Sequence, residues 1–179
     1  MTIQDTDRDA RILLADAATL TPEEYKTVFR QHPAGVAVVT LVGPDGPVGF
    51  TATSVISVSA EPPLLAFSIA SGSSSWPALA QAASVAVSFL ADDQDDVSAR
   101  FATSGIDRFA AGGWTALPTG EVVIDGALTW LRGRVVQRTP IGDSYLVSVL
   151  ASQSATRADT QPLVFHDRTY HRIGDHTAI

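Results

Sequence analysis

The chain has 179 residues, of which 45% are hydrophobic, and a formal net charge of −7. These values predict one folded domain with a sizeable core, and the acidic balance argues against a nucleic-acid-binding surface. The sequence contains no cysteine, which excludes disulfides, thiolate nucleophiles and thiolate-bound zinc or iron–sulfur clusters. No apolar run approaches the ~18 residues of a membrane span, and the polar N-terminus is unlike a signal peptide. We therefore expect a cytoplasmic protein.

The N-terminal region predicts an arm followed by a helix. Residues 1–20 show no clear pattern and are expected to form a flexible arm that packs on a partner subunit, whereas residues 21–179 form one domain. Segment 21–24, Thr-Pro-Glu-Glu, combines a capping residue, a proline at the first helical position and a glutamate placed for a capping box. Pro33 ends this helix.

The rest of the chain predicts many short strands and few helices. The expected strands are 35–42, 48–53, 64–69, 84–90, one or two within 122–136, 145–154, 163–166 and 169–173. The expected helices are 76–82 and 94–102, and residues 103–120 are expected to be loop. Many short strands between turns are typical of an antiparallel barrel, although periodicity alone fits a sandwich equally well.

A stretch rich in hydroxyl groups follows Gly49. Five of the nine positions from 51 to 59 carry a hydroxyl, namely Thr51, Thr53, Ser54, Ser57 and Ser59. Any one of them could be an ordinary strand or turn residue. Their density favours a second interpretation, in which hydroxyls and backbone N–H groups bind a flat polar ring system and a phosphate without formal charge.

Two further features are candidates for binding a phosphate. The serine-rich loop 71–75 leads into a helix, so it is either a simple N-cap or a phosphate site at a helix N-terminus. Arg100 is either an exposed helical residue paired with Asp96 or the counter-charge of that phosphate. Nothing in the sequence matches a dinucleotide glycine fingerprint or a phosphate-loop motif.

No metal site is expected. His166, His171 and His176 are each five residues apart, so successive side chains alternate between opposite faces of a strand. That spacing is not typical of a metal triad. The tryptophans are expected to lie in the core or in an interface rather than to stack on a ligand.

A series of short blocks, in order along the chain, carries a resemblance to a known family. The blocks are 33–40, 49–54 (Gly-Phe-Thr-Ala-Thr-Ser), 57–59, 62–64, 73–76, 85–90, 100–102 (Arg-Phe-Ala), 107–109 (Asp-Arg-Phe), 125–131, 142–143 and 162–165. Taken together, residues 29–173 resemble the short-chain flavin reductases, the reductase components of two-component flavin monooxygenases. No block is decisive alone, but the ordered series is specific.

The resemblance implies a fold, a reaction and partners. The implied fold is mainly β: an antiparallel Greek-key split β-barrel, the FMN-binding split barrel, with a few short flanking helices. The implied activity is that of an NAD(P)H:flavin oxidoreductase, which transfers a hydride from NADH or NADPH to N5 of FMN or FAD. A homodimer and a partner monooxygenase that receives the reduced flavin are also implied.

The resemblance also implies roles for individual residues. Thr51, Ala52, Thr53 and Ser54 would line the flavin ring and ribityl chain, and Ser68, Ile69 and Ala70 would flank the ring. Ser74, Ser75 and Arg100 would bind the phosphate end, with Phe101 and Ala102 nearby.

One position departs from the family pattern. The family commonly has Gly-Asp-His on the nicotinamide side, where this chain has Gly142, Asp143 and Ser144. Asp143 and Ser144 are the expected catalytic residues, and serine keeps a hydrogen-bonding group but lacks the flat, titratable imidazole. This departure motivates an alternative function, a non-catalytic flavin carrier on the same fold. A third possibility is a relative that binds haem or a deazaflavin.

Overall fold

The computed structural model describes residues 18–157 and 159–174. Contacts within the chain group it into two units, residues 1–32 and 33–179. The expected arm at residues 1–20 lies almost wholly outside the described residues, so the boundary between arm and domain stays a prediction. None of the helices within the described ranges is long and apolar enough to cross a membrane.

The first unit contains the predicted helix, α2 (Pro22–Arg30). Its capping box is present: the Glu24 backbone N–H donates to Thr21 Oγ1 at 3.3 Å, and the Thr21 N–H donates to the Glu24 carboxylate at 2.8 Å. These bonds satisfy two amides that the first turn leaves without intrahelical partners. The helix also exposes three large apolar side chains, those of Tyr25, Val28 and Phe29.

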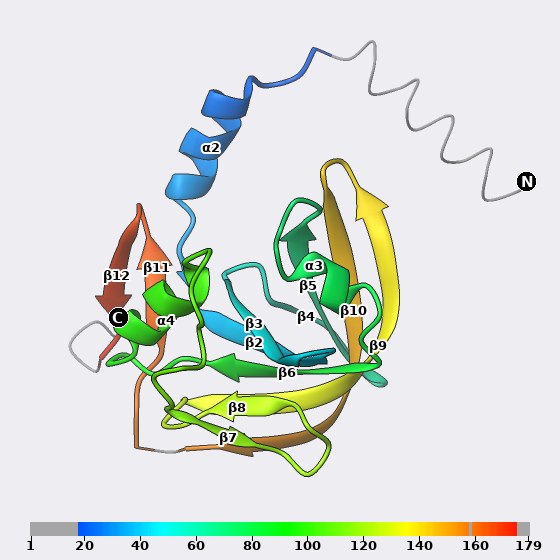
Figure 1. Cartoon of the computed structure of the whole chain (residues 1–179). Coiled ribbons are helices and arrows are strands. Elements are labelled where there is room, and N and C mark those ends of the chain that lie inside the picture. Colours follow the sequence, from blue (N-terminus) through cyan, green and yellow to red (C-terminus); the bar gives the residue numbers. More distant parts are fainter. Residues whose placement is uncertain (1–17, 158, 175–179) are drawn as a thin grey trace, which may run out of the picture. The chain divides into compact units, whose positions relative to one another are not determined.

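The second unit is built on one seven-stranded antiparallel sheet (Figure 1). In spatial order its strands are β3 (Gly46–Ala52), β2 (Ala37–Gly43), β6 (Ser84–Phe89), β9 (Thr129–Ile141), β10 (Ser144–Thr156), β5 (Pro63–Ala70) and β4 (Ile56–Ala60). The sheet curls, with β9 and β10 forming a long hairpin. Within the described residues, edge strands β3 and β4 do not pair with each other, so the barrel is open.

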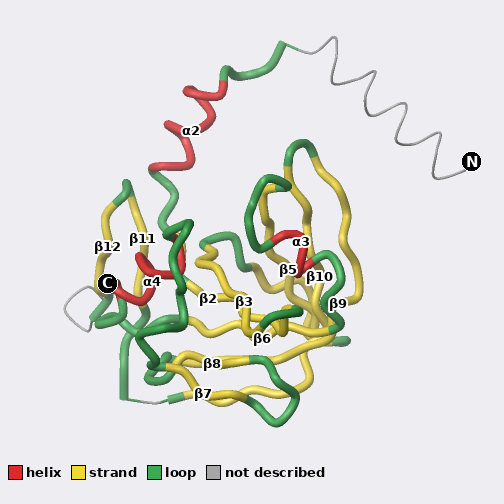
Figure 2. Tube along the Cα trace, in the orientation of Figure 1, coloured by secondary structure: helices red, strands yellow, loops and turns green. Residues whose placement is uncertain are grey.

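Smaller elements pack around this sheet (Figure 2). They are a three-stranded sheet of β1 (Ala34–Gly35), β11 (Leu163–His166) and β12 (Thr169–Arg172), the hairpin of β7 (Trp114–Ala116) and β8 (Val122–Ile124), and helices α3 (Trp76–Leu79) and α4 (Asp95–Ala102). Helix α3 contributes Leu79 to the barrel core. The predicted closing hairpin across residues 167–168 corresponds to β11 and β12.

Strand β2 is buried on both faces and separates two cores. Val39 and Leu41 point into the barrel core, together with residues of β3, β5, β6 and β10. Val36 and Val38 belong to a second core that includes Phe101 of α4. This explains why the segment is almost continuously apolar instead of alternating.

Gly49 allows β3 to approach the second core closely. A Cβ at this position would lie 2.8 Å from the Phe101 ring and 3.1 Å from the Phe109 ring. The two rings are themselves packed edge to face, with centroids 5.1 Å apart. Any side chain at residue 49 would therefore push α4 and the following loop away from the strand.

Most predicted elements are present, with four differences. Strand β9 runs to Ile141, beyond the predicted limit of residue 136. Strand β4 was not predicted. Its serines occupy every second position, as in a strand with one polar face, but they were interpreted as ligand-binding hydroxyls. Strand β7 lies within the predicted loop 103–120. Helix α3 ends at Leu79, short of residue 82, where the Arg138 guanidinium donates to the carbonyls of Leu79 and Ala82.

Candidate functional site

The outer face of β3 carries the start of the hydroxyl-rich stretch. Phe50 and Ala52 point into the barrel core, so the alternate residues Gly49 and Thr51 face the opposite side. There, Thr51 Oγ1 donates to the Ser98 carbonyl of α4 at 2.6 Å. This bond links the strand to the helix, so the Thr51 hydroxyl has a structural role.

Arg108 lies next to this face with its charge unpaired. Its guanidinium donates to the carbonyls of Thr103 (2.8 Å) and Gly49 (2.7 Å) and to Ser75 Oγ (3.3 Å), all of them neutral acceptors. No carboxylate in the described ranges forms an ion pair with it. Burial lowers the pKa of Arg108 from its usual value, but an arginine remains charged at neutral pH. The arrangement leaves a fixed positive charge for an anionic ligand.

A cavity of about 320 Å³ opens beside this arginine. We call it the serine pocket; Gly49, Ser74, Ser75, Arg108 and Phe109 are among its lining residues. Its size is at the lower end of the range for small-molecule sites. Hydroxyl groups and a guanidinium can both donate to a phosphate, and the pocket is also lined by Asp107. Ser74 and Ser75 of loop 71–75 line this pocket beside Arg108, and not beside the predicted Arg100, so the phosphate site stays a prediction.

The residues predicted for the ring end lie where β5 and β10 meet. The Ser68 N–H donates to Ser54 Oγ at 3.0 Å, which joins the end of β3 to β5. Ala70 is paired with Ser144 across the sheet. The Ser71 N–H donates to the Asp143 carbonyl at 2.9 Å, and Ser144 Oγ donates to Asp143 Oδ1 at 3.0 Å. Hydrogen bonds and strand pairing thus link Ser54, Ser68, Ala70, Asp143 and Ser144.

Other predicted residues are placed differently. The Arg100 guanidinium donates to the Gly112 carbonyl at 3.3 Å, and its buried Nε has no partner within the described part of the chain. Its side chain is not among those lining the serine pocket. Phe101 is fully buried, and the side chains of Ala52 and Ile69 point into the barrel core, whereas Ala102 is exposed. The binding role of Arg100 stays a prediction.

Sequence reasoning gave Arg108 no role. The signal available was the tripeptide Asp107-Arg108-Phe109, which matched a family block but carries little information by itself. Arg108 is 33 residues from Ser75 along the chain, and only the fold brings the two together.

A second charged cluster, the Glu121 cluster, lies against the sheet and is fully satisfied. The buried Glu121 carboxylate accepts hydrogen bonds from Ser84, Thr119 and Arg132. Burial raises the pKa of Glu121, but the hydrogen bonds from these three side chains outweigh it, and the net pKa is lowered. The cluster anchors the turn before β8 to strands β6 and β9, which is a structural role.

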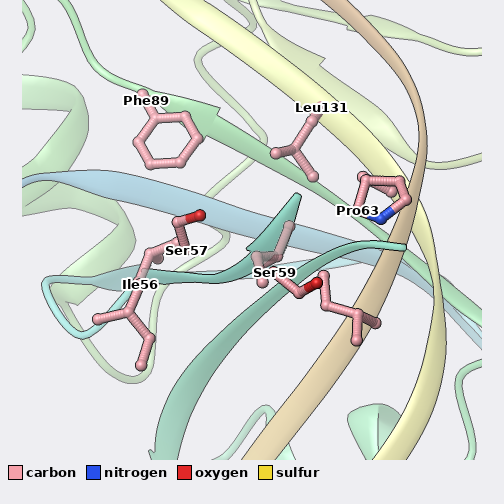
Figure 3. Close-up of a pocket in the computed structure, with 10 residues that line it drawn as sticks. Ile56, Ser57, Ser59, Pro63, Phe89 and Leu131 are labelled. Carbon is pink, nitrogen blue, oxygen red and sulfur yellow. The ribbon is translucent and has the colours of Figure 1, made fainter. Parts of the chain in front are cut away.

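A separate apolar groove of about 360 Å³ runs along edge strand β4. Figure 3 shows Phe89 and Leu131 on one side of this groove and Ser57 and Ser59 of β4 on the other. Its walls are mostly carbon, and it holds no charged side chain among its lining residues. Ser57 and Ser59 thus belong to a different surface from Thr51 and Ser54.

An open antiparallel barrel with a pocket that holds serine hydroxyls and an unpaired guanidinium is suited to bind a phosphate-bearing organic molecule. The chain belongs to the flavin reductase-like family, whose domain matches residues 29–174. The predicted family and mainly β split-barrel fold are thereby confirmed.

Comparison with known proteins gives three informative relatives. The chain is 45% identical to an NADH:FMN oxidoreductase of Rhodococcus erythropolis over 154 residues, which are 83% of this chain and 80% of the relative. It is 32% identical to the reductase subunit HsaB of a flavin-dependent monooxygenase from Mycobacterium tuberculosis, covering 91% and 85%. The solved NADH:FAD oxidoreductase SgcE6 of Streptomyces globisporus, in complex with NAD and FAD fragments, superposes with a TM-score of 0.83 at 26% identity, covering 90% of this chain and 100% of that one.

Proposed function

We propose that this protein is an NAD(P)H:flavin oxidoreductase that reduces FMN or FAD and supplies the reduced flavin to a partner monooxygenase. The reaction class and the reactants, flavin and NADH, agree with the names of the relatives. The observation that carries the proposal is the position of the unpaired Arg108 beside Ser75, in a pocket next to the outer face of β3.

The residues present fit a flavin. Ser74, Ser75 and Arg108 supply neutral and charged donors for the flavin phosphate. Thr53 and Ser54 lead from that end toward Ser68 and thus toward the ring end. When bound, flavin supplies the ring that accepts a hydride, so the protein needs mainly to hold and orient its reactants.

Asp143 and Ser144 are proposed to position the nicotinamide. They adjoin Ala70 at the start of β10, beside the proposed ring end. The Ser144 hydroxyl donates to Asp143, so the pair presents a fixed polar edge. Hydride transfer between two stacked rings needs no general acid or base from this edge, which is why a serine can replace an imidazole here.

Two further properties are proposed. We propose a homodimer, because edge strand β4 exposes Ile56 and Val58 beside the apolar groove, and an exposed apolar edge favours pairing with a second copy. Light scattering during gel filtration tests this, and a monomer at all concentrations would refute it. We also propose a cytoplasmic location, which fits an enzyme that consumes NAD(P)H.

The partner is proposed from a relative. The similar HsaB chain is named as the reductase subunit of a flavin-dependent monooxygenase, and a reductase that releases its reduced flavin requires such a consumer. Addition of a monooxygenase with its organic substrate should couple NADH oxidation to oxygenated product.

The decisive experiment follows oxidation of NADH and NADPH by absorbance, with and without riboflavin, FMN or FAD. Flavin-dependent oxidation is the expected result. Quenching of flavin fluorescence without any oxidation would instead indicate the flavin carrier that Ser144 suggested. Absence of flavin binding, with a spectral change on adding haem or a deazaflavin, would overturn the proposed function.

A further inference from the structure

One end of loop 71–75 is attached to β10 through the main chain. Ala70, the last residue of β5, pairs with Ser144 across the sheet. The Ser71 N–H then donates to the Asp143 carbonyl at 2.9 Å. Because both contacts involve backbone groups, this end of the loop stays in place when side chains are substituted.

The other end of the loop is attached to β10 by a ring contact. Trp76 directly follows the loop and begins α3, and its ring stacks on the Tyr145 ring with centroids 3.6 Å apart and an interplanar angle of 15°. Both rings are partly buried and pack against the barrel core. Tyr145 follows Ser144 in β10, so neighbouring residues of one strand hold the two ends of the loop. The ring contact depends on side chains, and a substitution can therefore release it.

The loop between these ends folds into tight turns that carry Ser75 to the serine pocket. The Ser73 N–H donates to the Ala70 carbonyl, and the Trp76 N–H donates to the Ser73 carbonyl, both at 3.0 Å. The Ser75 N–H donates to Ser73 Oγ at 3.3 Å. Ser75 is only 1% exposed, and its hydroxyl accepts a hydrogen bond from Arg108. The position of this hydroxyl is thus set beside the residue whose ring is stacked.

We propose that Trp76 and Tyr145 are positioning residues: their stacked rings hold Ser75 in the serine pocket and thereby raise the affinity for a flavin phosphate. Neither ring lines the pocket, so both act through Ser75 and not by contact with the ligand. Donors that are ordered before binding lose less conformational entropy when the ligand binds. The inference rests on the proposed function, since it takes the serine pocket as the flavin phosphate site.

The test compares FMN with riboflavin, which has the same ring system without the phosphate. Dissociation constants for both are measured by quenching of flavin fluorescence for the wild type, Trp76→Leu and Tyr145→Leu. The two variants remove the same contact from opposite sides, so either one that folds decides the question. Trp76→Phe and Tyr145→Phe keep an aromatic ring and are the conservative variants. The readout is the ratio of the FMN and riboflavin dissociation constants, because a loss of overall stability weakens both ligands alike.

Phe89 supplies a matched control for a purely structural effect. Like Trp76, it is partly buried against the barrel core, but it lines the apolar groove along β4 and not the serine pocket. Phe89→Leu therefore makes the same kind of change in the same core. It should lower the free energy of unfolding and leave the ratio of FMN to riboflavin affinity unchanged.

We expect Trp76→Leu and Tyr145→Leu each to raise the dissociation constant for FMN by about three- to tenfold, with little change for riboflavin. The phenylalanine variants should keep most of the FMN affinity. Because the two rings form one contact, the double leucine variant should bind FMN no more weakly than the weaker single variant. An unchanged ratio in the leucine variants, or an equal change in Phe89→Leu, would overturn the inference.

Arg108→Ala separates failure of this inference from failure of the proposed phosphate site. If Arg108→Ala weakened FMN selectively and the leucine variants did not, the phosphate site would stand and only the positioning role would fall. If none of these variants changed the ratio, the flavin phosphate would not lie in the serine pocket, and both would fall. A higher KM for NADH in the leucine variants, with the ratio unchanged, would show that the stack acts on the start of β10 and would refute its action through Ser75.

Discussion

The Glu121 cluster and the serine pocket differ in how a buried charge is neutralised. Glu121 has no exposed side-chain surface and is surrounded by Ser84, Thr119 and Arg132, so every charge has a partner inside the protein. Arg108 is partly buried as well, yet its partners are two carbonyls and one hydroxyl of Ser75. A charge that is neutralised internally stabilises the fold, whereas Arg108, held by neutral acceptors where a pocket opens, remains available to a ligand.

The largest expected effect comes from breaking the satisfied cluster. Glu121→Ala leaves the Arg132 guanidinium, whose side chain is only 20% exposed, without its ion pair. Removal of one partner of a buried pair typically destabilises by about 3 kcal/mol or more. Urea denaturation should show this loss in the free energy of unfolding, with the flavin dissociation constant of the remaining folded protein unchanged.

A surface ion pair supplies the control for this variant. Glu23 pairs with Lys26 at 2.9 Å, and both side chains are more than half exposed. Glu23→Ala should change the free energy of unfolding by less than about 0.5 kcal/mol. Equal effects of the two substitutions would mean that the Glu121 cluster is not the structural anchor inferred from its burial.

The next effect concerns the unpaired charge. Arg108→Ala removes charge-assisted hydrogen bonds worth about 1.5–3 kcal/mol, so the dissociation constant for FMN should rise by roughly 10- to 100-fold. Riboflavin has no phosphate, and its binding should be nearly unchanged. Stability should fall only slightly, because the carbonyls of Gly49 and Thr103 become accessible to water.

Arg100→Ala is the matched comparison for that variant. Arg100 donates to the Gly112 carbonyl and does not line the serine pocket, so its removal should leave the ratio of FMN to riboflavin affinity unchanged. If Arg100→Ala lowered this ratio and Arg108→Ala did not, the phosphate would be bound by Arg100, as the family resemblance implies.

A smaller effect is expected from titration of the Glu121 cluster. The pKa of Glu121 is lowered below its usual 4.5 in the folded protein, so the unfolded state takes up the proton first as the pH falls. Its stabilisation is fully present above the unfolded pKa and is lost as the pH falls through the folded pKa. The difference in unfolding free energy between the wild type and Glu121→Gln should be constant at neutral pH and narrow in acid. A difference that widened in acid would contradict the lowered pKa.

Secondary-structure elements that depend on local sequence patterns could be predicted, whereas contacts that depend on the fold could not. Alternation and turn residues located most strands, and the capping box of α2 was predicted from segment 21–24. Strand β4 was missed because its serines suggested binding rather than an exposed edge. Arg100 and Arg108 are both arginines close to a phenylalanine, and no local pattern tells which guanidinium reaches Ser75. That distinction required the loop after α4 to fold back over β3.

The smallest expected effect tests the one departure from the family pattern. Ser144 lies at the start of β10, paired with Ala70, and its hydroxyl donates to Asp143. Ser144→His would place a flat ring beside the proposed nicotinamide position, and an aromatic contact of this kind is worth about 0.5–1.5 kcal/mol. The KM for NADH should therefore fall by a few-fold, while the flavin dissociation constant stays the same.

The control for this substitution lies on the same strand. Ser154 is exposed near the far end of β10, so Ser154→His adds an imidazole without approaching Ala70 and should leave the KM for NADH unchanged. A fall in KM that grew stronger below the usual histidine pKa of about 6.5 would mean that charge, rather than the flat ring, supplies the gain. No change in KM at any pH would mean that the nicotinamide does not lie at the start of β10, and Asp143 and Ser144 would lose their proposed role while the serine pocket kept its own.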